Sequence, residues 1–344
     1  MGEFIRFAVD TAKSVFQVHG EDAGRSQVLQ KRLRRGQFLA FFARQASCVV
    51  VLEACGSAHH WGRELSKLGH EVRLIPPQHV KPFVKRNKND MRDAEAIFEA
   101  SLRPGTHFVP IKTIPQQCDR ALHRGRDLLT RQRTQLGNCI RSMLSEAGII
   151  APQGAAGSAK LYAMIEAGDG AGDGAIAPQL LVVVRQLLGQ WRALHAAVDV
   201  MGKQIEEAVR ADPRARRLMQ IPGIGPITAH AVIAAIGDGT QFRGARDFAA
   251  WVGLTPRQDS SAEKIRLGHI SKAGDRSLRR LLVLGASSWL RHAKHNPDKA
   301  SPWLSGLLAR RPVKVAVVAQ AAKNARIVWA LLTSGEHYRV PAAT

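Results

Sequence analysis

The stretch CVVVLEA, residues 48–54, is a short run of apolar and mostly β-branched residues that contains one acid near its end. Such a continuous run is typical of a strand that is buried on both faces of a mixed sheet. Before it, FIRFAVD (4–10) and VFQVHG (15–20) are separated by a short polar turn, and another strand-like stretch lies near 26–33. The pattern predicts a β-hairpin followed by a third strand, with residues 48–54 as the central buried strand.

Helices alternate with strands after this hairpin. The remaining predicted elements are a helix near 36–46, a helix over 58–69, a strand over 71–75, a helix over 77–86 and a helix that begins within KNDMRDAEAIF (88–98). Three strands, helix, strand, helix, strand, helix is the element order of a ribonuclease-H-like α/β domain. We expect this domain to span residues 1–110.

The chain is strongly basic. Its 344 residues include 50 Lys and Arg against 28 Asp and Glu, which gives a formal charge of +22 and a pI near 10.8. This excess predicts a polyanionic partner, with DNA and RNA as the first candidates. A membrane surface is the competing polyanion, but the start of the chain lacks a signal-peptide pattern and no apolar run reaches about 18 residues. The sequence therefore predicts a cytoplasmic protein without a membrane partner.

Cysteine and histidine spacing does not favour a structural metal site. The four cysteines contain no C-x-x-C pair and lack nearby histidines at zinc-site spacing; they are Cys48, Cys55, Cys118 and Cys139. They are interpreted as reduced thiols in cores or on helix faces. The neighbouring His59 and His60 are interpreted as surface or packing residues.

Two long helices with a heptad-like apolar repeat are predicted after the α/β domain. The first, near 114–148, has Leu122, Leu129, Leu136 and Met143 at intervals of seven. The second, over 180–209, has apolar residues at alternating intervals of four and three: Leu180, Val184, Leu187, Trp191, Leu194, Val198, Met201 and Ile205. The Gly- and Ala-rich stretch between them predicts a flexible linker near 150–178. We expect a coiled-coil arm over 111–212, paired within the chain or between chains, with an ordinary core face as the alternative.

A glycine-containing turn opens the last third of the chain, residues 213–344. In LMQIPGIGPITAHAVIAAIGD (218–238), Gly223 and Gly225 lie between two predicted helices. Backbone N–H groups at such a turn can bind a phosphate oxygen regardless of base sequence. The stretch resembles a helix-hairpin-helix motif of DNA-binding proteins. The alternative is a packing turn in which glycine only permits the backbone conformation.

Four acids are predicted to converge in the α/β domain. Asp10 ends the first strand, and Glu53 ends the central buried strand, where a charge is costly unless it lies at the open edge of the sheet. Asp90 and Asp93 lie three residues apart on one helix face. Helix capping by Asp90 and a favourable helix-dipole position for Asp93 are the structural alternative. In a cationic chain, four converging carboxylates favour a site for two Mg²⁺ or Mn²⁺ ions.

The order of the motifs resembles that of a known family. The successive stretches are VDTAK, LEACGS, KNDMRDAEAI, IPGIG, FAAWVGLTPRQDSS and RLGHISKAGDRSLRRLL. They are similar, in order, to the motifs of the DEDD transposases encoded by bacterial insertion sequences of family one-ten, the bridge-RNA-guided recombinases. The resemblance spans roughly residues 4–335 and is interrupted by the linker.

The resemblance implies a metal-dependent enzyme that recombines donor and target DNA under the direction of a guide RNA. It implies an N-terminal domain like a Holliday-junction resolvase, an arm, and a mostly helical C-terminal transposase domain. The implied metal-binding acids are Asp10, Glu53, Asp90 and Asp93, and the implied nucleophile is Ser261. Composite sites in a homo-oligomer, a dimer or a tetramer, are also implied.

The serine loop departs from the family pattern. Relatives commonly have Ser-Gly-Gly-Lys where this chain has Ser261, Ala262, Glu263 and Lys264. Ser260 is therefore an alternative nucleophile. Cations expected to contact nucleic acid near this loop are Lys264, Arg266, Lys272, Arg276, Arg279 and Arg280.

Two other functions remain open from the sequence. A junction-resolving endonuclease would need the four carboxylates and a metal-activated water but no serine. A basic scaffold would bind nucleic acid without cutting it.

Overall fold

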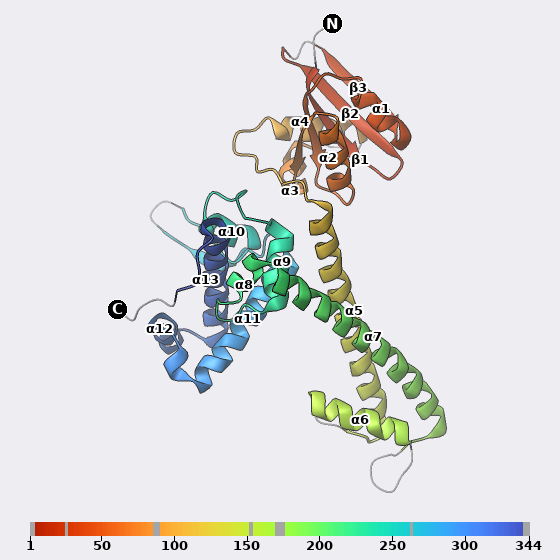
Figure 1. Cartoon of the computed structure of the whole chain (residues 1–344), viewed down its shortest axis with the longest axis vertical. Coiled ribbons are helices and arrows are strands. Elements are labelled where there is room, and N and C mark those ends of the chain that lie inside the picture. Colours follow the sequence, from red (N-terminus) through yellow and green to blue (C-terminus); the bar gives the residue numbers. More distant parts are fainter. Residues whose placement is uncertain are drawn as a thin grey trace. The chain divides into compact units, whose positions relative to one another are not determined.

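The computed structural model of the chain describes residues 4–24, 27–84, 90–150, 154–168, 176–261 and 264–339. Contacts divide the chain into an N-terminal unit, Met1–Ile114, and a C-terminal unit, Pro115–Thr344 (Figure 1). The N-terminal unit is α/β, and the C-terminal unit is mostly helical.

A five-stranded mixed sheet forms the centre of the N-terminal unit, with strand order β3-β2-β1-β4-β5. Its strands are β1 (Phe4–Thr11), β2 (Val15–Asp22), β3 (Val28–Arg34), β4 (Val49–Glu53) and β5 (Glu71–Ile75). The first three strands are antiparallel, whereas β4 runs parallel to both β1 and β5. Each of the five strands predicted from the sequence is present, because the apolar patterning along each segment is local information.

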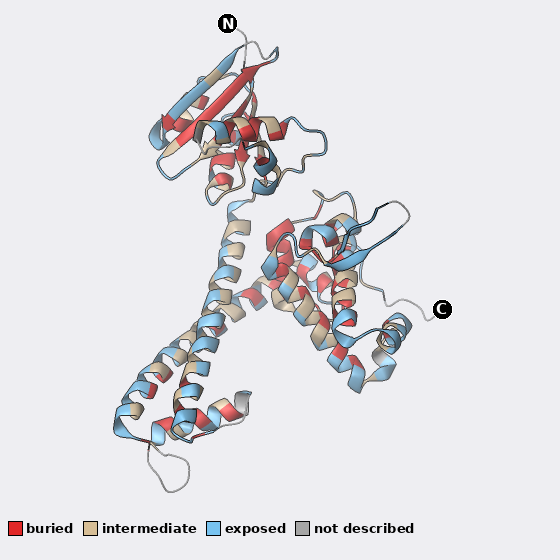
Figure 2. Ribbon diagram, turned by 180° about the vertical axis from the view of Figure 1, so that it is seen from behind, coloured by how far each residue is buried: buried red, intermediate tan, exposed pale blue. Residues whose placement is uncertain are grey.

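Helices cover both faces of this sheet. They are α1 (Phe38–Phe42), α2 (Ala58–Lys67), α3 (Pro77–Val80) and α4 (Asp90–Ser101), with the 3₁₀ turns η1 (Arg35–Gln37) and η2 (Lys81–Phe83). Side chains of α1 and α2 join one apolar cluster with the sheet, whereas α3 and α4 join another that contains Ala8 and Val51. Buried positions lie along the central strands and on the inward sides of the helices (Figure 2).

Two of these helices are shorter than predicted. The helix expected near 36–46 is only α1, preceded by η1. In the range 77–86, α3 gives way to a 3₁₀ turn that contains Pro82, which lacks the N–H needed for a continuing α-helix. The last two positions of that range lie outside the described residues.

The C-terminal unit begins with two long helices, α5 (Ile114–Glu146) and α7 (Pro178–Ala211). They lie side by side and antiparallel: Arg133 of α5 donates to His195 of α7 at 3.0 Å, and a Cβ on Gly125 would contact Met201. The predicted apolar stripe of α7 faces inward, with every member buried or half-buried.

The expected linker near 150–178 contains a helix, so the prediction of a flexible linker is wrong for residues 155–167. Helix α6 (Ala155–Ala167) contributes Leu161, Tyr162 and Ile165 to an apolar cluster with α5 and α7. The Gly- and Ala-rich composition of this segment gives no helix signal. Its three large apolar residues stabilise a helix only because they pack against α5 and α7.

The remaining helices form a second core. They are α8 (Pro213–Leu218), α9 (Pro226–Ile236), α10 (Ala245–Val252), α11 (Arg276–His295), α12 (Pro302–Arg310) and α13 (Val313–Ser334), with the 3₁₀ turn η3 (Pro297–Lys299). A two-stranded hairpin, β6 (Pro256–Gln258) and β7 (Leu267–Ile270), precedes α11.

Helix α13 is long and apolar enough, by length and composition alone, to cross a membrane. In this structure it packs against α8, α10, α11 and α12. Its Asn324 is fully buried and donates a 2.9 Å hydrogen bond to the Pro222 carbonyl. These contacts make it a core helix of the C-terminal unit.

Candidate active site

Asp10 and Glu53 lie at adjoining strand ends. Strands β1 and β4 are parallel, and their register pairs Val9 with Leu52, so the next residue on each strand is an acid. The carboxyl ends of parallel strands meet at one edge of a sheet, where chain direction changes and polar groups can reach a ligand. The sheet therefore holds two carboxylates side by side at this edge.

Both acids share the face of the sheet that α4 covers. Side chains alternate between faces along a strand, so Asp10 lies on the face of Ala8, and Glu53 lies on the face of Val51. Ala8 and Val51 belong to the apolar cluster that includes Ile97 of α4. The packing of α4 thus brings Asp93 toward the same region.

A third acid, Asp93 of α4, acts electrostatically on Glu53. Burial raises the pKa of Glu53 above its ordinary value, and the negative charges of Asp10 and Asp93 raise it further. Each of these three side chains is half-buried. Carboxylates that repel one another in this way are stabilised by a cation, and hard oxygen atoms are the ligands that Mg²⁺ and Mn²⁺ prefer.

The donor chemistry thus fits a divalent cation, although the arrangement of the described residues is not a closed cage. Among the side chains that the structure describes, no group of three or more His, Cys, Asp or Glu residues is arranged to hold an ion. Asp90 begins α4, one helical turn before Asp93, but its side chain lies outside the described residues. Its role as the fourth acid stays a prediction.

Cys55, predicted to be a reduced thiol in a core or on a helix face, is a free cysteine two residues after Glu53. Its Sγ lies 2.9 Å from the hydroxyl oxygen of Thr11, the residue that follows Asp10. This contact links the last residue of β1 to the loop that follows β4. The order of residues in the sequence offered no signal for it, because 44 positions separate the two side chains.

Ser260 and Ser261 lie in the loop of the β6–β7 hairpin, and their surroundings differ. The Ser260 hydroxyl accepts a 3.2 Å hydrogen bond from the backbone N–H of Arg266 across the loop. Ser261 is exposed, and its carbonyl, not its hydroxyl, accepts from the backbone N–H of Lys264 at 3.1 Å. Both serines are exposed, and they differ in that the Ser260 hydroxyl is held in a hydrogen bond within the loop. Ala262 and Glu263 lie outside the described residues.

The predicted cations near this loop fall into two groups. Lys264, Arg266, Lys272 and Arg276 are exposed. Arg279 instead directs its guanidinium at the protein backbone, donating to the carbonyls of Val252 at 2.8 Å and Ala273 at 2.6 Å.

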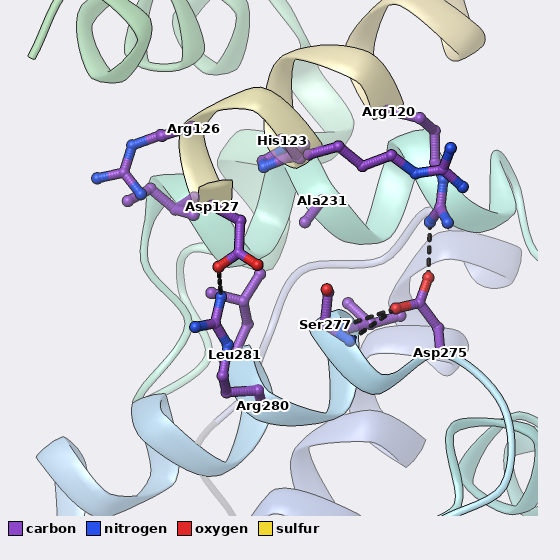
Figure 3. A pocket seen from close by; sticks show the side chains of 12 residues that line it. Arg120, His123, Arg126, Asp127, Ala231, Asp275, Ser277, Arg280 and Leu281 are labelled. Carbon is purple, nitrogen blue, oxygen red and sulfur yellow. Dashed lines mark hydrogen bonds and ion pairs between the residues drawn. The ribbon is translucent and has the colours of Figure 1, made fainter. Parts of the chain in front are cut away.

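Arg280 forms an ion pair with Asp127 of α5 (Figure 3). It lines a small cavity of about 80 Å³ between α5, α9 and α11. Across this cavity, Arg120 of α5 donates at 2.7 Å to Asp275, the residue that caps α11. Neither pair could be predicted from the sequence, because more than 150 positions separate the partners of each.

The two glycines of the predicted DNA-binding turn also differ. Gly223 has a φ of 87°, and a Cβ there would lie 2.7 Å from the carbonyl oxygen of Gly285 in α11. Gly225 is the residue before α9, has extended backbone, and has open space where a Cβ would be. Close packing therefore explains glycine at 223, and only Gly225 leaves room for a ligand to approach.

Comparison with known proteins gives the family. A profile of the DEDD transposases, described as "Transposase", matches residues 7–149, and a second profile, "Transposase IS116/IS110/IS902 family", matches residues 215–301.

Three relatives match nearly the whole chain. The "Probable family 20 transposase" of Pseudomonas aeruginosa is 47% identical over 97% of this chain and 98% of its own length. The "Transposase for insertion sequence element IS1111A" of Coxiella burnetii is 41% identical over 96% of this chain and 90% of its own. The "Transposase for insertion sequence element IS1328" of Yersinia enterocolitica is 39% identical over 95% and 96%.

The chain belongs to the IS116/IS110/IS902 family of insertion-sequence transposases. It is accordingly an enzyme, a DNA transposase, and its DEDD domain indicates dependence on a divalent metal.

Proposed function

We propose that this transposase cuts and rejoins DNA by means of metal-binding carboxylates in its N-terminal unit and a serine nucleophile in its C-terminal unit. The observation that carries the proposal is the placement of Asp10 and Glu53 at adjoining strand ends, with the charge of Asp93 acting on Glu53. Helix capping alone would not require two carboxylates at adjoining strand ends beside a helix that carries a third.

The sheet supports a ribonuclease-H-like, resolvase-like assignment of the N-terminal unit. Three antiparallel strands are followed by two parallel ones, in the order β3-β2-β1-β4-β5, with helices on both faces. In this assignment the catalytic acids belong at the end of the first strand, at the end of the fourth, and on the helix that packs over them. Asp10, Glu53 and Asp93 occupy those positions, with Asp90 as the fourth acid.

The four acids would hold Mg²⁺ or Mn²⁺, which when bound neutralises phosphate charge and stabilises attacking and leaving oxygen atoms. The carboxylates of Asp10 and Glu53 would hold the cation at the open edge of the sheet, where the phosphodiester could bind to it. Asp93 would close the site from the side of α4.

Ser261 would attack the scissile phosphorus through its Oγ, whose proton is lost to a base or to solvent. As the Oγ–P bond forms, the bond from phosphorus to the leaving deoxyribose oxygen breaks, and that oxygen takes up a proton. A hydroxyl of a new strand then attacks the phosphoserine, and Ser261 is released. The number of phosphodiester bonds is conserved, so rejoining needs no external energy source.

Both serines are exposed, and the hydrogen bond that engages the Ser260 hydroxyl favours position 261 within this mechanism. A junction-resolving endonuclease would share the acids but would not require an exposed serine in this hairpin. The carboxylates and the serine belong to different units, and the proposal includes composite sites within a dimer or tetramer.

Nucleic-acid binding in this proposal follows the charge of the chain. Donor and target DNA would contact the exposed Lys264, Arg266, Lys272 and Arg276, and a backbone phosphate would approach Gly225 in a helix-hairpin-helix manner. A bridge RNA as guide rests on the family resemblance, because guide pairing, and not the protein, would choose the sequence. The antiparallel α5 and α7 would form the coiled-coil arm, and the enzyme would act in the bacterial cytoplasm.

Replacement of the acids tests the proposal. Asp10→Asn, Glu53→Gln, Asp90→Asn and Asp93→Asn should each abolish strand cleavage and leave nucleic-acid binding nearly unchanged. Glu71→Gln is the matched control, because Glu71 is an exposed acid at the opposite end of the sheet, where β5 begins. Wild-type cleavage rates in three of the four site variants would reject the assignment.

A further inference from the structure

Gln17 on β2 is paired with Asp10 on β1 in the antiparallel ladder. Paired residues project from the same face of a sheet, with Cβ atoms about 4.5–5.5 Å apart. The next pair along this face is Ala8 with His19, which lies beneath α4: the ring centroid of His19 is 5.1 Å from that of Phe98. Gln17 therefore shares with Asp10 the face of the sheet that carries the acids.

Three adjoining strands thus each place one oxygen-bearing side chain at this edge. Gln17 comes from β2, Asp10 from β1 between its neighbours, and Glu53 from β4. Residues on the other face of β2 are different in kind: Phe16 and Val18 belong to the apolar core with α1 and α2. The polar residue at position 17 is thus confined to the side of the acids.

The amide of Gln17 is buried and incompletely bonded. The residue is 7% exposed, and its Oε1 has no hydrogen-bond partner among the described residues. A buried carbonyl oxygen without a partner carries a free-energy cost that an aliphatic side chain of similar size would avoid. Packing under α4 therefore does not account for glutamine here, whereas a ligand that enters the site would.

We propose that Gln17 is a further ligand residue of the carboxylate site, whose Oε1 binds the divalent cation directly or through one bound water. The inference rests on the proposed metal-dependent function. A neutral amide oxygen is a hard ligand that adds no negative charge to acids that already repel one another. The Gln17 oxygen would bind the cation from the side of Asp10 that faces β2, opposite to Glu53 on β4. On that side no described acid is paired with Asp10 in the sheet.

Binding of Mn²⁺ to the full-length chain, followed by the electron paramagnetic resonance signal of free Mn²⁺, tests the assignment without reference to activity. Gln17→Leu should raise the Kd about tenfold, since loss of groups that support a metal site typically costs 10- to 100-fold in affinity. Gln17→Glu restores an oxygen and should bind with wild-type affinity or more tightly. Gln30→Leu is the matched control, because Gln30 is an exposed glutamine of the same sheet on β3, and it should leave the Kd unchanged.

The outcomes separate this inference from the proposed function. Wild-type Mn²⁺ affinity in folded Gln17→Leu, with weakened binding in Asp10→Asn, would overturn the role of Gln17 and leave the carboxylate site intact. If Gln17→Leu does not fold, Gln17→Glu decides, because loss of Mn²⁺ binding in that folded variant contradicts an oxygen-ligand role. Wild-type affinity in Asp10→Asn would overturn the metal site itself, and the role of Gln17 with it.

Discussion

Gly223→Ala should destabilise the C-terminal unit strongly, whereas Gly225→Ala should not. The φ of 87° at Gly223 lies in the left-handed region, which costs a residue with a Cβ about 1–2 kcal/mol. The new methyl would also lie 2.7 Å from the Gly285 carbonyl oxygen and 2.9 Å from its carbon, and these backbone atoms move only with α11. Overpacking of this kind costs about 1–3 kcal/mol, so the expected loss is about 2–5 kcal/mol.

Gly225 provides the contrast within the same turn. Its φ of −98° and ψ of 179° suit any residue, and apart from Gly225 and its two chain neighbours no described residue has an atom within 4 Å of the position that a methyl group would take. Its replacement by alanine should change stability by less than about 0.5 kcal/mol. If a phosphate oxygen approaches this position, the added methyl group should weaken DNA binding without affecting folding.

Urea unfolding of the full-length chain by tryptophan fluorescence measures both variants, since every tryptophan except Trp61 lies in the C-terminal unit. Trp289 is a direct reporter, because its Cβ would lie 3.3 Å from the methyl group of Ala at position 223. DNA affinity is measured in parallel at fixed salt. Wild-type stability in Gly223→Ala, together with weakened DNA binding, would refute the packing role of Gly223. It would indicate instead that Gly223 contacts nucleic acid.

Three further measurements address individual parts of the account. Arg279→Ala should lower the free energy of unfolding by about 2 kcal/mol, because two charge-assisted hydrogen bonds to carbonyls are lost; unchanged stability with reduced DNA affinity would instead indicate a direct phosphate contact. The raised pKa of Glu53 means that its ionisation is less favourable in the folded chain than in the unfolded chain. Metal-free stability should therefore fall as the pH rises from the ordinary value of 4.5 through the raised pKa, and Glu53→Gln should remove this part of the melting profile; identical profiles would contradict it. DNA affinity should fall by about 10³- to 10⁵-fold between 50 and 200 mM salt if 6–10 phosphates are contacted, and a nearly flat salt dependence in filter binding would exclude such an interface.

The α/β unit could be predicted because its signals are local. The unbroken apolar run before Glu53 marks a buried strand, and the alternation before Asp10 marks another, so both acids could be placed at strand ends without knowledge of tertiary contacts. The early end of the helix over 77–86 was also accessible, because Pro82 is visible in the sequence.

The rest depends on partners that are distant in the chain. Arg279 could not be distinguished from its exposed neighbours, because its carbonyl acceptors at Val252 and Ala273 are set by tertiary packing. The turn at Gly223 is visible in the sequence, whereas the close approach of Gly285 comes from a helix about sixty residues later in the chain. Gln17 is a single amide within a strand pattern, and only the pairing with Asp10 gives it a candidate role.

Covalent attachment of DNA to the protein tests the central claim most directly. The full-length enzyme is trapped on a nicked or mismatched DNA substrate with Mg²⁺, digested, and analysed by mass spectrometry. We predict a nucleotide adduct on Ser261 that persists in Ser260→Ala and is absent in both Ser261→Ala and Asp10→Asn. Efficient recombination by both single serine variants, with no adduct on either residue, would contradict the serine mechanism.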